Sequence, residues 1–181
     1  YVATPHATHY DYARQAIDAG VHVLCEKPMT LSRAETADLY ERAAERGVVL
    51  LEAVKTAFAP GFQRMVAVAR SGSIGRIRSV DATFTKLVHD GRELHGSAGG
   101  SISELATYPL LAAVKLLGTE FTDIRTTSLR PDGSEVEVFS RIDLTYASAV
   151  ASARTGLGVK AEGDLIVAGT RGYVYVPAPW W

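Results

Sequence analysis

The short apolar run over residues 21–25 constrains the fold most, because it ends abruptly in Glu26, Lys27 and Pro28. Such a run between turn signals is typical of a buried strand. In open α/β sheets, ligands bind just outside the carboxyl ends of the strands. Pro28 favours an extended backbone at Lys27, so the pattern predicts an amine at the rim of a sheet, where partial desolvation suits it to acid–base chemistry. A surface lysine that simply ends a strand fits these residues equally well.

The sequence around this run predicts strands that alternate with helices. One helix is expected over about 7–19 and ends at Gly20. A second begins at the capping box formed by Ser32 and Glu35, runs to about Arg46 and ends at Gly47. A second buried strand is expected over 48–51, and this order indicates parallel βαβ units. The residues expected to face inward are Tyr10, Ala13 and Ile17 in the first helix and Ala37, Tyr40 and Ala44 in the second.

After about Thr56 the pattern changes. One amphipathic helix is expected over 60–70, and a second over 101–117, with a kink at Pro109. Between and after them lie strand-like runs, several of which alternate apolar and polar residues, as in an antiparallel sheet with one covered face. These runs are 77–87, 121–129, 135–146, 150–157, 164–168 and 173–176. The predicted fold class is α/β: the C-terminal part of a doubly wound parallel sheet (1–56), then an α+β domain with a mainly antiparallel open sheet (57–181).

Composition narrows the function classes. The chain has 181 residues and a formal net charge of −1. It has no run of Lys or Arg typical of a nucleic-acid-binding protein, and no apolar segment of membrane-spanning length, so neither a nucleic acid nor a membrane is an expected partner. The single cysteine rules out an internal disulfide and fits a reducing compartment such as the cytoplasm. The chain starts without Met and stops after two Trp, so we expect an internal piece of a longer protein, for which the lack of a targeting signal is uninformative.

A second informative stretch begins at Gly99 and Gly100. Glu104 and Tyr108 follow it four residues apart, so they are expected to share a helix face. An acid and a phenol behind a glycine pair suit recognition of a hydroxylated substrate, and a tyrosine can relay a proton. Two plainer interpretations remain: Ser101 and Glu104 also fit a capping box, and Tyr108 fits half-buried packing.

His6 and His9 have a spacing that would allow a metal site. No Cys or acid cluster accompanies them, so no metal is predicted. The alternative is a loop at a strand end, in which Thr4 and His6 line a ligand cleft and His9 lies in the first helical turn.

Three motifs together resemble the Gfo/Idh/MocA oxidoreductases. They are Thr4-Pro5-His6-x-x-His9, then Glu26-Lys27-Pro28, then Gly99-Gly100-Ser101 followed by an acid and an aromatic residue four apart. The resemblance covers nearly the whole chain in the same order. It implies an N-terminal Rossmann domain, a C-terminal domain whose open sheet often mediates oligomerisation, and hence a homo-oligomer. It also implies hydride transfer between NAD or NADP and a secondary alcohol or ketone of a sugar, polyol or related small molecule.

The resemblance also implies roles for single residues. Lys27 would lie between nicotinamide and substrate. Tyr108 would be the proton donor or acceptor for the substrate oxygen, polarised by Lys27, and Glu104 takes the family's Asp position as a third catalytic residue. The residues expected at the cofactor are Thr4, Pro5, His6, His9, Glu26, Lys27 and Pro28.

Several departures from the family pattern bear on the substrate. Glu104 is one methylene longer than the usual Asp, Ala106 replaces a usual Gly, and Ala57 stands where many members carry Arg. Glu104 favours an alternative, a non-catalytic cofactor-binding sensor or assembly subunit. The Gly-rich phosphate loop and the acid that reads the ribose are not in this chain, so the choice between NAD and NADP is open. The piece alone is expected to bind the cofactor weakly or not at all.

Overall fold

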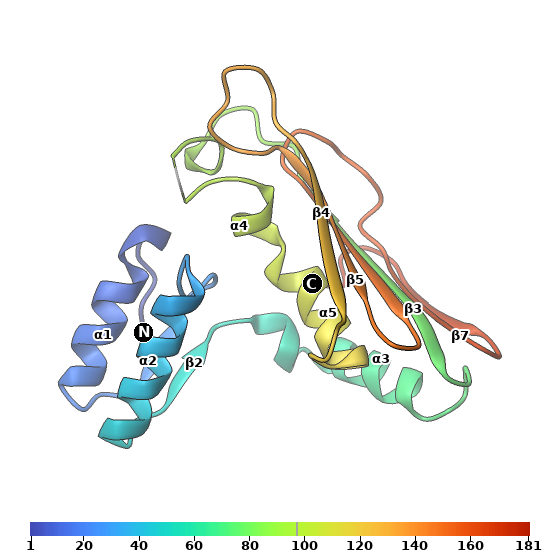
Figure 1. Cartoon of the computed structure of the whole chain (residues 1–181), viewed down its shortest axis with the longest axis horizontal. Helices are drawn as coiled ribbons and strands as arrows, with labels where there is room; N and C mark the ends of the chain where they lie inside the picture. The colour runs from blue at the N-terminus through green and yellow to red at the C-terminus, as the bar shows by residue number, and fades with distance from the viewer. Residues whose placement is uncertain (97) are drawn as a thin grey trace. The chain divides into compact units, whose positions relative to one another are not determined.

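The computed structural model describes residues 1–96 and 98–181. The chain forms two compact units, Tyr1–Val54 and Lys55–Trp181. In Figure 1 the first unit runs from blue to cyan and most of the second from green to red.

The first unit is a parallel strand pair covered by two helices. Strands β1 (Val23–Cys25) and β2 (Leu50–Glu52) pair in parallel, and Val2 adds a parallel bridge to Cys25. A 3-10 turn, His6–Thr8, leads into α1 (His9–Asp18), and α2 (Arg33–Arg46) connects the two strands. The two helices lie side by side in Figure 1. The predicted parallel βαβ arrangement is confirmed.

Both helices of this unit end where the sequence predicts. Gly20 follows α1 and Gly47 caps α2, and each has a positive φ, 76° and 65°, which favours glycine. At the start of α2, the Ser32 hydroxyl accepts a hydrogen bond from the Glu35 N–H at 3.2 Å. The Glu35 carboxylate reaches the N–H of Leu31, also at 3.2 Å, rather than that of Ser32. The capping box is therefore formed in a variant that caps one residue earlier.

The predicted inner face of α2 is wrong. The residues of α2 that are buried are Leu39 and Ala43, whereas Tyr40 is 47% exposed and Ala37 and Ala44 face solvent. Leu39 and Ala43 are also four apart, so the same periodicity fits a face rotated by one residue. Leu39 has no polar atom to desolvate, while burial of a tyrosine hydroxyl requires a hydrogen-bond partner. In α1, Ala13 and Ile17 are fully buried as predicted, and Tyr10 is half-buried.

The opposite face of the strand pair carries apolar side chains that the described residues leave exposed. Leu24 and Leu51 are direct neighbours in the parallel register, and with Val49 each is between 43% and 53% exposed. The parallel strands are thus buried on one side within this unit.

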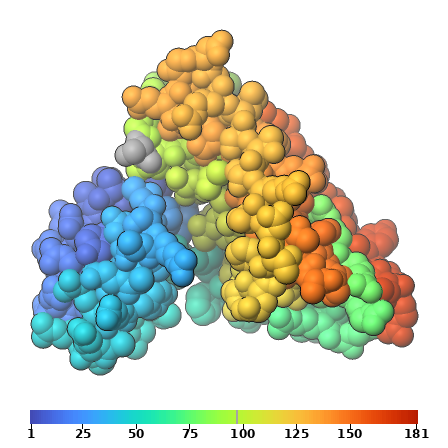
Figure 2. All heavy atoms as spheres, in the orientation of Figure 1, coloured from blue at the N-terminus to red at the C-terminus, as the bar shows by residue number. Residues whose placement is uncertain are grey.

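The second unit is built on a six-stranded sheet. Its strand order is β4-β5-β6-β3-β7-β8, and each neighbouring pair is antiparallel except β3 with β6, which is parallel. The strands are β3 (Ile77–Thr85), β4 (Asp123–Leu129), β5 (Phe139–Thr145), β6 (Val150–Gly156), β7 (Leu165–Gly169) and β8 (Tyr173–Val176). The mainly antiparallel sheet is as predicted. β4 is exposed along its whole length, and its yellow-orange atoms lie on the face that Figure 2 shows.

Helices cover one face of this sheet. They are α3 (Pro60–Arg70), α4 (Ser101–Leu105) and α5 (Thr107–Leu117), with two 3-10 turns at Lys55–Phe58 and Arg92–Leu94. The helix α5 packs against β3 and β6, and its residues Ala112 and Leu116 join a core that includes Val80 and Leu165. Ala112 and Leu116, four residues apart, thus form part of the inner face of α5.

The kink predicted at Pro109 divides one helix into two. Pro109 has no N–H to donate to the carbonyl of Leu105, and the helix is interrupted at Ala106 between them. Glu104 and Tyr108 consequently lie on consecutive helices, rather than on one as predicted.

The strand predicted over 135–146 begins later than expected, at Phe139. Glu137, just before it, accepts hydrogen bonds from the start of α4. Its carbonyl accepts from Ser101 N–H at 3.0 Å and its carboxylate from Ile102 N–H at 2.9 Å. Both the carbonyl and the carboxylate of Glu137 are thus bonded to the start of α4.

Candidate active site

The rim at the carboxyl ends of β1 and β2 carries three of the predicted cofactor residues, and the other four follow the Val2 bridge. β1 ends at Cys25, so Glu26, Lys27 and Pro28 follow the strand directly and are each half-buried. The Lys27–Pro28 peptide is cis. The strand begins two residues later than the apolar run and ends with it at Cys25, so Lys27 follows it at the edge where α/β sheets bind ligands.

His9 connects the segment after β1, at Pro28, with the segment after the Val2 bridge, at Thr4. Its Nδ1 lies 2.8 Å from the carbonyl oxygen of Pro28, and its Nε2 lies 2.8 Å from that of Thr4. A carbonyl oxygen only accepts, so both contacts are hydrogen bonds when both ring nitrogens carry hydrogen. The side chain is 0% exposed. Its predicted part in cofactor binding stays a prediction, and the geometry gives it an indirect form, through Thr4 and Pro28.

The segment before α1 is shaped by local contacts. The Thr8 hydroxyl lies 2.8 Å from both Thr4 Oγ1 and the Pro5 carbonyl oxygen. His6 is buried, and its ring centroid lies 5.5 Å from that of His9 in an edge-on arrangement. The two imidazoles are thus neighbours, as the spacing suggested. Over 1–96 and 98–181, His, Cys, Asp and Glu form no group of three that would hold a metal ion.

Two carboxylates frame the segment that carries Lys27. Glu26 accepts hydrogen bonds from the Tyr1 hydroxyl and, at 3.3 Å, from the Lys27 N–H. Glu52, which ends β2, accepts one from the Met29 N–H at 2.9 Å. Glu52 is not among the residues predicted for the site. Its signal was available, because it stands at the end of the second parallel strand as Glu26 stands after the first.

Cys25, the last residue of β1, has an unreactive thiol. Its side chain is fully buried. Burial and then the negative charges of Glu52 and Glu26 raise the pKa of its thiol to about 11. Only a thiolate is a good nucleophile, so the folded protein keeps this thiol unreactive near neutral pH.

A thiol-labelling experiment tests this. At about pH 8 we expect a disulfide reagent to leave Cys25 unmodified in the folded protein and to modify it fully after unfolding in guanidinium chloride. The unfolded thiol titrates near its ordinary pKa of about 8.5, below the folded value. The free energy of unfolding is therefore at its full value with respect to this thiol below about pH 8.5. It falls as the pH rises toward the pKa of Cys25 in the folded protein. Rapid labelling of the folded protein would contradict the burial of this side chain.

The second unit contains Glu104 and Tyr108. Glu104, in α4, is 4% exposed, and its Oε1 lies 3.6 Å from a guanidinium nitrogen of Arg92. Tyr108, near the start of α5, is 8% exposed, and its ring packs at 5.3 Å, centroid to centroid, from that of Phe84. The sequence alone does not indicate Arg92, because nothing in its spacing from Glu104 shows that the two side chains meet.

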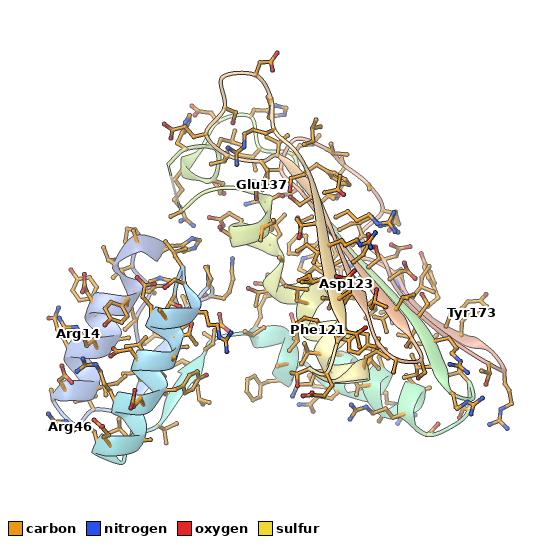
Figure 3. All side chains as sticks on the ribbon, viewed as in Figure 1. Arg14, Arg46, Phe121, Asp123, Glu137 and Tyr173 are labelled. Carbon is orange, nitrogen blue, oxygen red and sulfur yellow. The ribbon has the colours of Figure 1, made fainter. Side chains whose placement is uncertain are left out.

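The capping-box interpretation of Ser101 and Glu104 is wrong. α4 has no side-chain cap from its own residues. Instead, the Glu137 carboxylate accepts a hydrogen bond from the Ile102 N–H at the start of α4 (Figure 3). Ser101 uses its hydroxyl in a buried chain: Thr155 donates to Ser101 at 3.1 Å, Ser101 donates to Ser140 at 3.3 Å, and the Ser140 and Ser128 hydroxyls are 2.8 Å apart. The helix is thereby attached to three strands of the sheet.

The glycine pair allows close approach, but to groups of this chain. A Cβ on Gly99 would lie 2.7 Å from the Glu93 carbonyl oxygen, and one on Gly100 would lie 2.6 Å from the Glu137 carboxylate. Gly100 also has a φ of +100°, a region open essentially to glycine alone. The predicted role of this segment in substrate recognition stays a prediction.

The predicted site residues thus divide between the two units. Lys27 and the cofactor residues belong to the first, and Glu104 and Tyr108 belong to the second. The predicted action of Lys27 and Tyr108 on one substrate stays a prediction. Among the helices of the described segments, none has the length and apolar character needed to cross a membrane.

Two family models match the chain. The model of an oxidoreductase family with an NAD-binding Rossmann fold matches residues 1–54. The model of the GFO/IDH/MocA C-terminal domain matches residues 62–175.

Several curated proteins are similar in sequence. A D-xylose 1-dehydrogenase (NADP(+)) of Haloferax volcanii is 36% identical over 132 residues, which cover 71% of this chain and 40% of that protein. A trans-1,2-dihydrobenzene-1,2-diol dehydrogenase of Bos taurus is 29% identical over 184 residues, covering 100% of this chain and 55% of that protein. The chain spans about half the length of the curated relatives it matches.

Solved structures have the same fold. GenD2 from gentamicin A biosynthesis, in complex with NAD, has a TM-score of 0.89 and 28% identity, covering 97% of this chain and 53% of its own. A 3-ketoreductase of Actinomadura kijaniata, in complex with NADP, has a TM-score of 0.85 and 27% identity, covering 98% of this chain and 54% of its own.

Proposed function

This chain belongs to the Gfo/Idh/MocA family of oxidoreductases, and we propose that the whole protein is an enzyme that interconverts a secondary alcohol and a ketone. The substrate would be a sugar, polyol or related small molecule, and the cofactor NAD or NADP. The observation that carries the proposal is the position of Lys27. It follows the parallel strand β1 at the carboxyl edge of the sheet, where ligands bind in α/β folds.

The residues of the first unit fit the nicotinamide end of such a cofactor. Thr4 follows the strand bridge of Val2, and Lys27 follows β1, so both come after the carboxyl ends of parallel strands. When bound, the nicotinamide supplies or accepts the hydride. Thr4, Pro5 and His6 would form its wall, and the Lys27 side chain would lie between it and the substrate.

The proton would be handled by this chain's own side chains. In the reducing direction the Tyr108 hydroxyl would give its proton to the substrate oxygen, and in the oxidising direction it would take that proton back. The positive charge of Lys27 would stabilise the oxygen as its negative charge develops. Glu104 would bind a substrate hydroxyl, with its carboxylate directed by Arg92 at 3.6 Å.

A turnover screen of the whole protein tests the proposal. Aldoses, including D-xylose, and polyols would be offered with NAD⁺ and with NADP⁺, and the reduced cofactor followed by absorbance. At least one substrate is expected to turn over well above the uncatalysed rate. Cofactor binding in calorimetry without turnover on any of them would contradict the proposal and favour a sensor or assembly subunit, the alternative that Glu104 in place of Asp suggests.

Self-association through the open sheet stays a prediction. The open face of the sheet carries ion pairs, such as Arg141 with Asp143 at 2.9 Å and Arg125 with Asp123 at 3.0 Å. A second copy would have to match this charge pattern rather than an apolar surface. The cytoplasmic location also stays a prediction, from the single Cys.

A further inference from the structure

We propose that Glu52 is a positioning residue for Lys27, which it holds in place by fixing the peptide bond between Pro28 and Met29. The inference rests on the proposed function, because it assigns to Glu52 a role in that reaction. Glu52 would not touch the substrate or the cofactor; it would act through the backbone that follows Lys27.

The Pro28–Met29 peptide is held from both sides by side chains of different elements. Its carbonyl oxygen lies 2.8 Å from Nδ1 of His9, at the start of α1. Its N–H donates to Oε1 of Glu52, at the end of β2, at 2.9 Å. A peptide unit is planar, so two hydrogen bonds at its opposite edges fix its orientation. This plane begins one residue after Lys27.

The backbone before Lys27 is fixed as well. Glu26 N–H donates to the Val2 carbonyl at 2.8 Å, and Ala53 N–H donates to the Cys25 carbonyl at 2.7 Å. Cys25 and Glu52 are direct partners in the parallel register. The Lys27 segment is therefore tied to the strand ends before it and to Glu52 after it, and the side chain of Met29 is buried.

Loss of the Glu52 contact would leave the Pro28–Met29 peptide held only at its carbonyl edge. The Met29 N–H would lose a charge-assisted hydrogen bond, one of the stronger kinds in proteins. The chain around Lys27 would then have more freedom. A displacement of about 1 Å at a reacting group can lower a rate by about 100-fold, so a change that never touches the substrate is expected to reduce turnover.

Two substitutions distinguish the contribution of the length of the Glu52 side chain from that of its charge. Glu52→Gln removes the charge and keeps an oxygen at the same distance along the side chain, whereas Glu52→Asp keeps the charge and withdraws the oxygen by one methylene. If Glu52 positions Lys27 by its hydrogen bond, Glu52→Gln is expected to keep kcat within about threefold of the parent, and Glu52→Asp to lower it by about tenfold or more at little-changed KM.

The experiment uses the whole protein, with D-xylose and NADP⁺ as the probe, or the screened sugar that turns over fastest. Glu45→Gln and Glu45→Asp, at an exposed position of α2, are the matched controls and should leave kcat unchanged. Thermal unfolding of each variant identifies any that fail to fold. The pH profile of kcat should keep its shape in Glu52→Gln.

The pattern of outcomes decides the proposal. An inactive Glu52→Gln beside an active Glu52→Asp would overturn it in favour of a role for the charge itself. Two fully active variants would overturn it by showing that the hydrogen bond is dispensable. Absence of turnover by the parent protein on every substrate of the screen would instead refute the proposed function. A dead Lys27→Met beside a fully active Glu52→Asp would refute only the positioning role.

Discussion

Replacing Lys27 with Met in the whole protein is expected to lower kcat by about 10²–10⁴-fold, the usual contribution of a positioned acid–base or charged group. Met has nearly the length and volume of the lysine stem but no amine. Because Lys27 is half-buried after β1, the stem should keep its packing while the charge is lost. The effect should therefore appear in kcat, with a much smaller change in the temperature of unfolding.

The matched control is Lys115→Met, an exposed position of α5, which should leave kcat unchanged within error. Steady-state kinetics with the best sugar or polyol from the screen measure both variants. A loss of less than about tenfold for Lys27→Met would be strong evidence against Lys27 as a group that acts on the reacting oxygen.

Tyr108→Phe is expected to have an effect of similar size, again about 10²–10⁴-fold in kcat. The phenyl ring can keep its contact with Phe84, whose centroid lies 5.3 Å from that of the tyrosine ring, so the fold should be retained. Removal of the hydroxyl takes away the group that would accept the proton of the substrate alcohol in the oxidising direction and return it in the reducing direction. KM should change little, because such an interaction mainly serves the transition state.

Tyr175→Phe, at an exposed position of β8, is the control in the same unit and should behave as the parent. If Tyr108→Phe raised KM without a change in kcat, the hydroxyl would be a substrate-binding group and another residue would carry the proton. Measurement of kcat and KM for both variants with NAD⁺ and NADP⁺ separates these cases.

The elements of the fold followed closely from local signals in the sequence. Alternating runs and turn residues are short-range features, and so α3 and β8 begin and end where the sequence predicted. The break near Pro109 follows from the chemistry of one residue. The inner face of α2 could not be predicted in this way. Leu39 and Tyr40 are neighbours, and the helical period is compatible with an inner face that contains either of them.

The parts of the site that depend on distant residues were not visible in the sequence. Glu137 caps a helix that begins 36 residues before it in the chain, and Arg92 meets Glu104 from a separate turn. Glu52 fixes a peptide bond through a contact that depends on strand register. Local patterns singled out the candidate catalytic residues and the resemblance to a family gave them their roles, whereas these supporting contacts came from the structure.

The packing around Gly100 limits how this segment can vary. Its φ of +100° and the Glu137 carboxylate in the direction of a Cβ together exclude side chains of every size, including alanine. A shorter residue at position 137 would relieve the crowding but leave the backbone conformation unfavourable and the Ile102 N–H without its acceptor. Homologous sequences that keep this backbone conformation should therefore keep glycine at position 100, whatever residue stands at position 137.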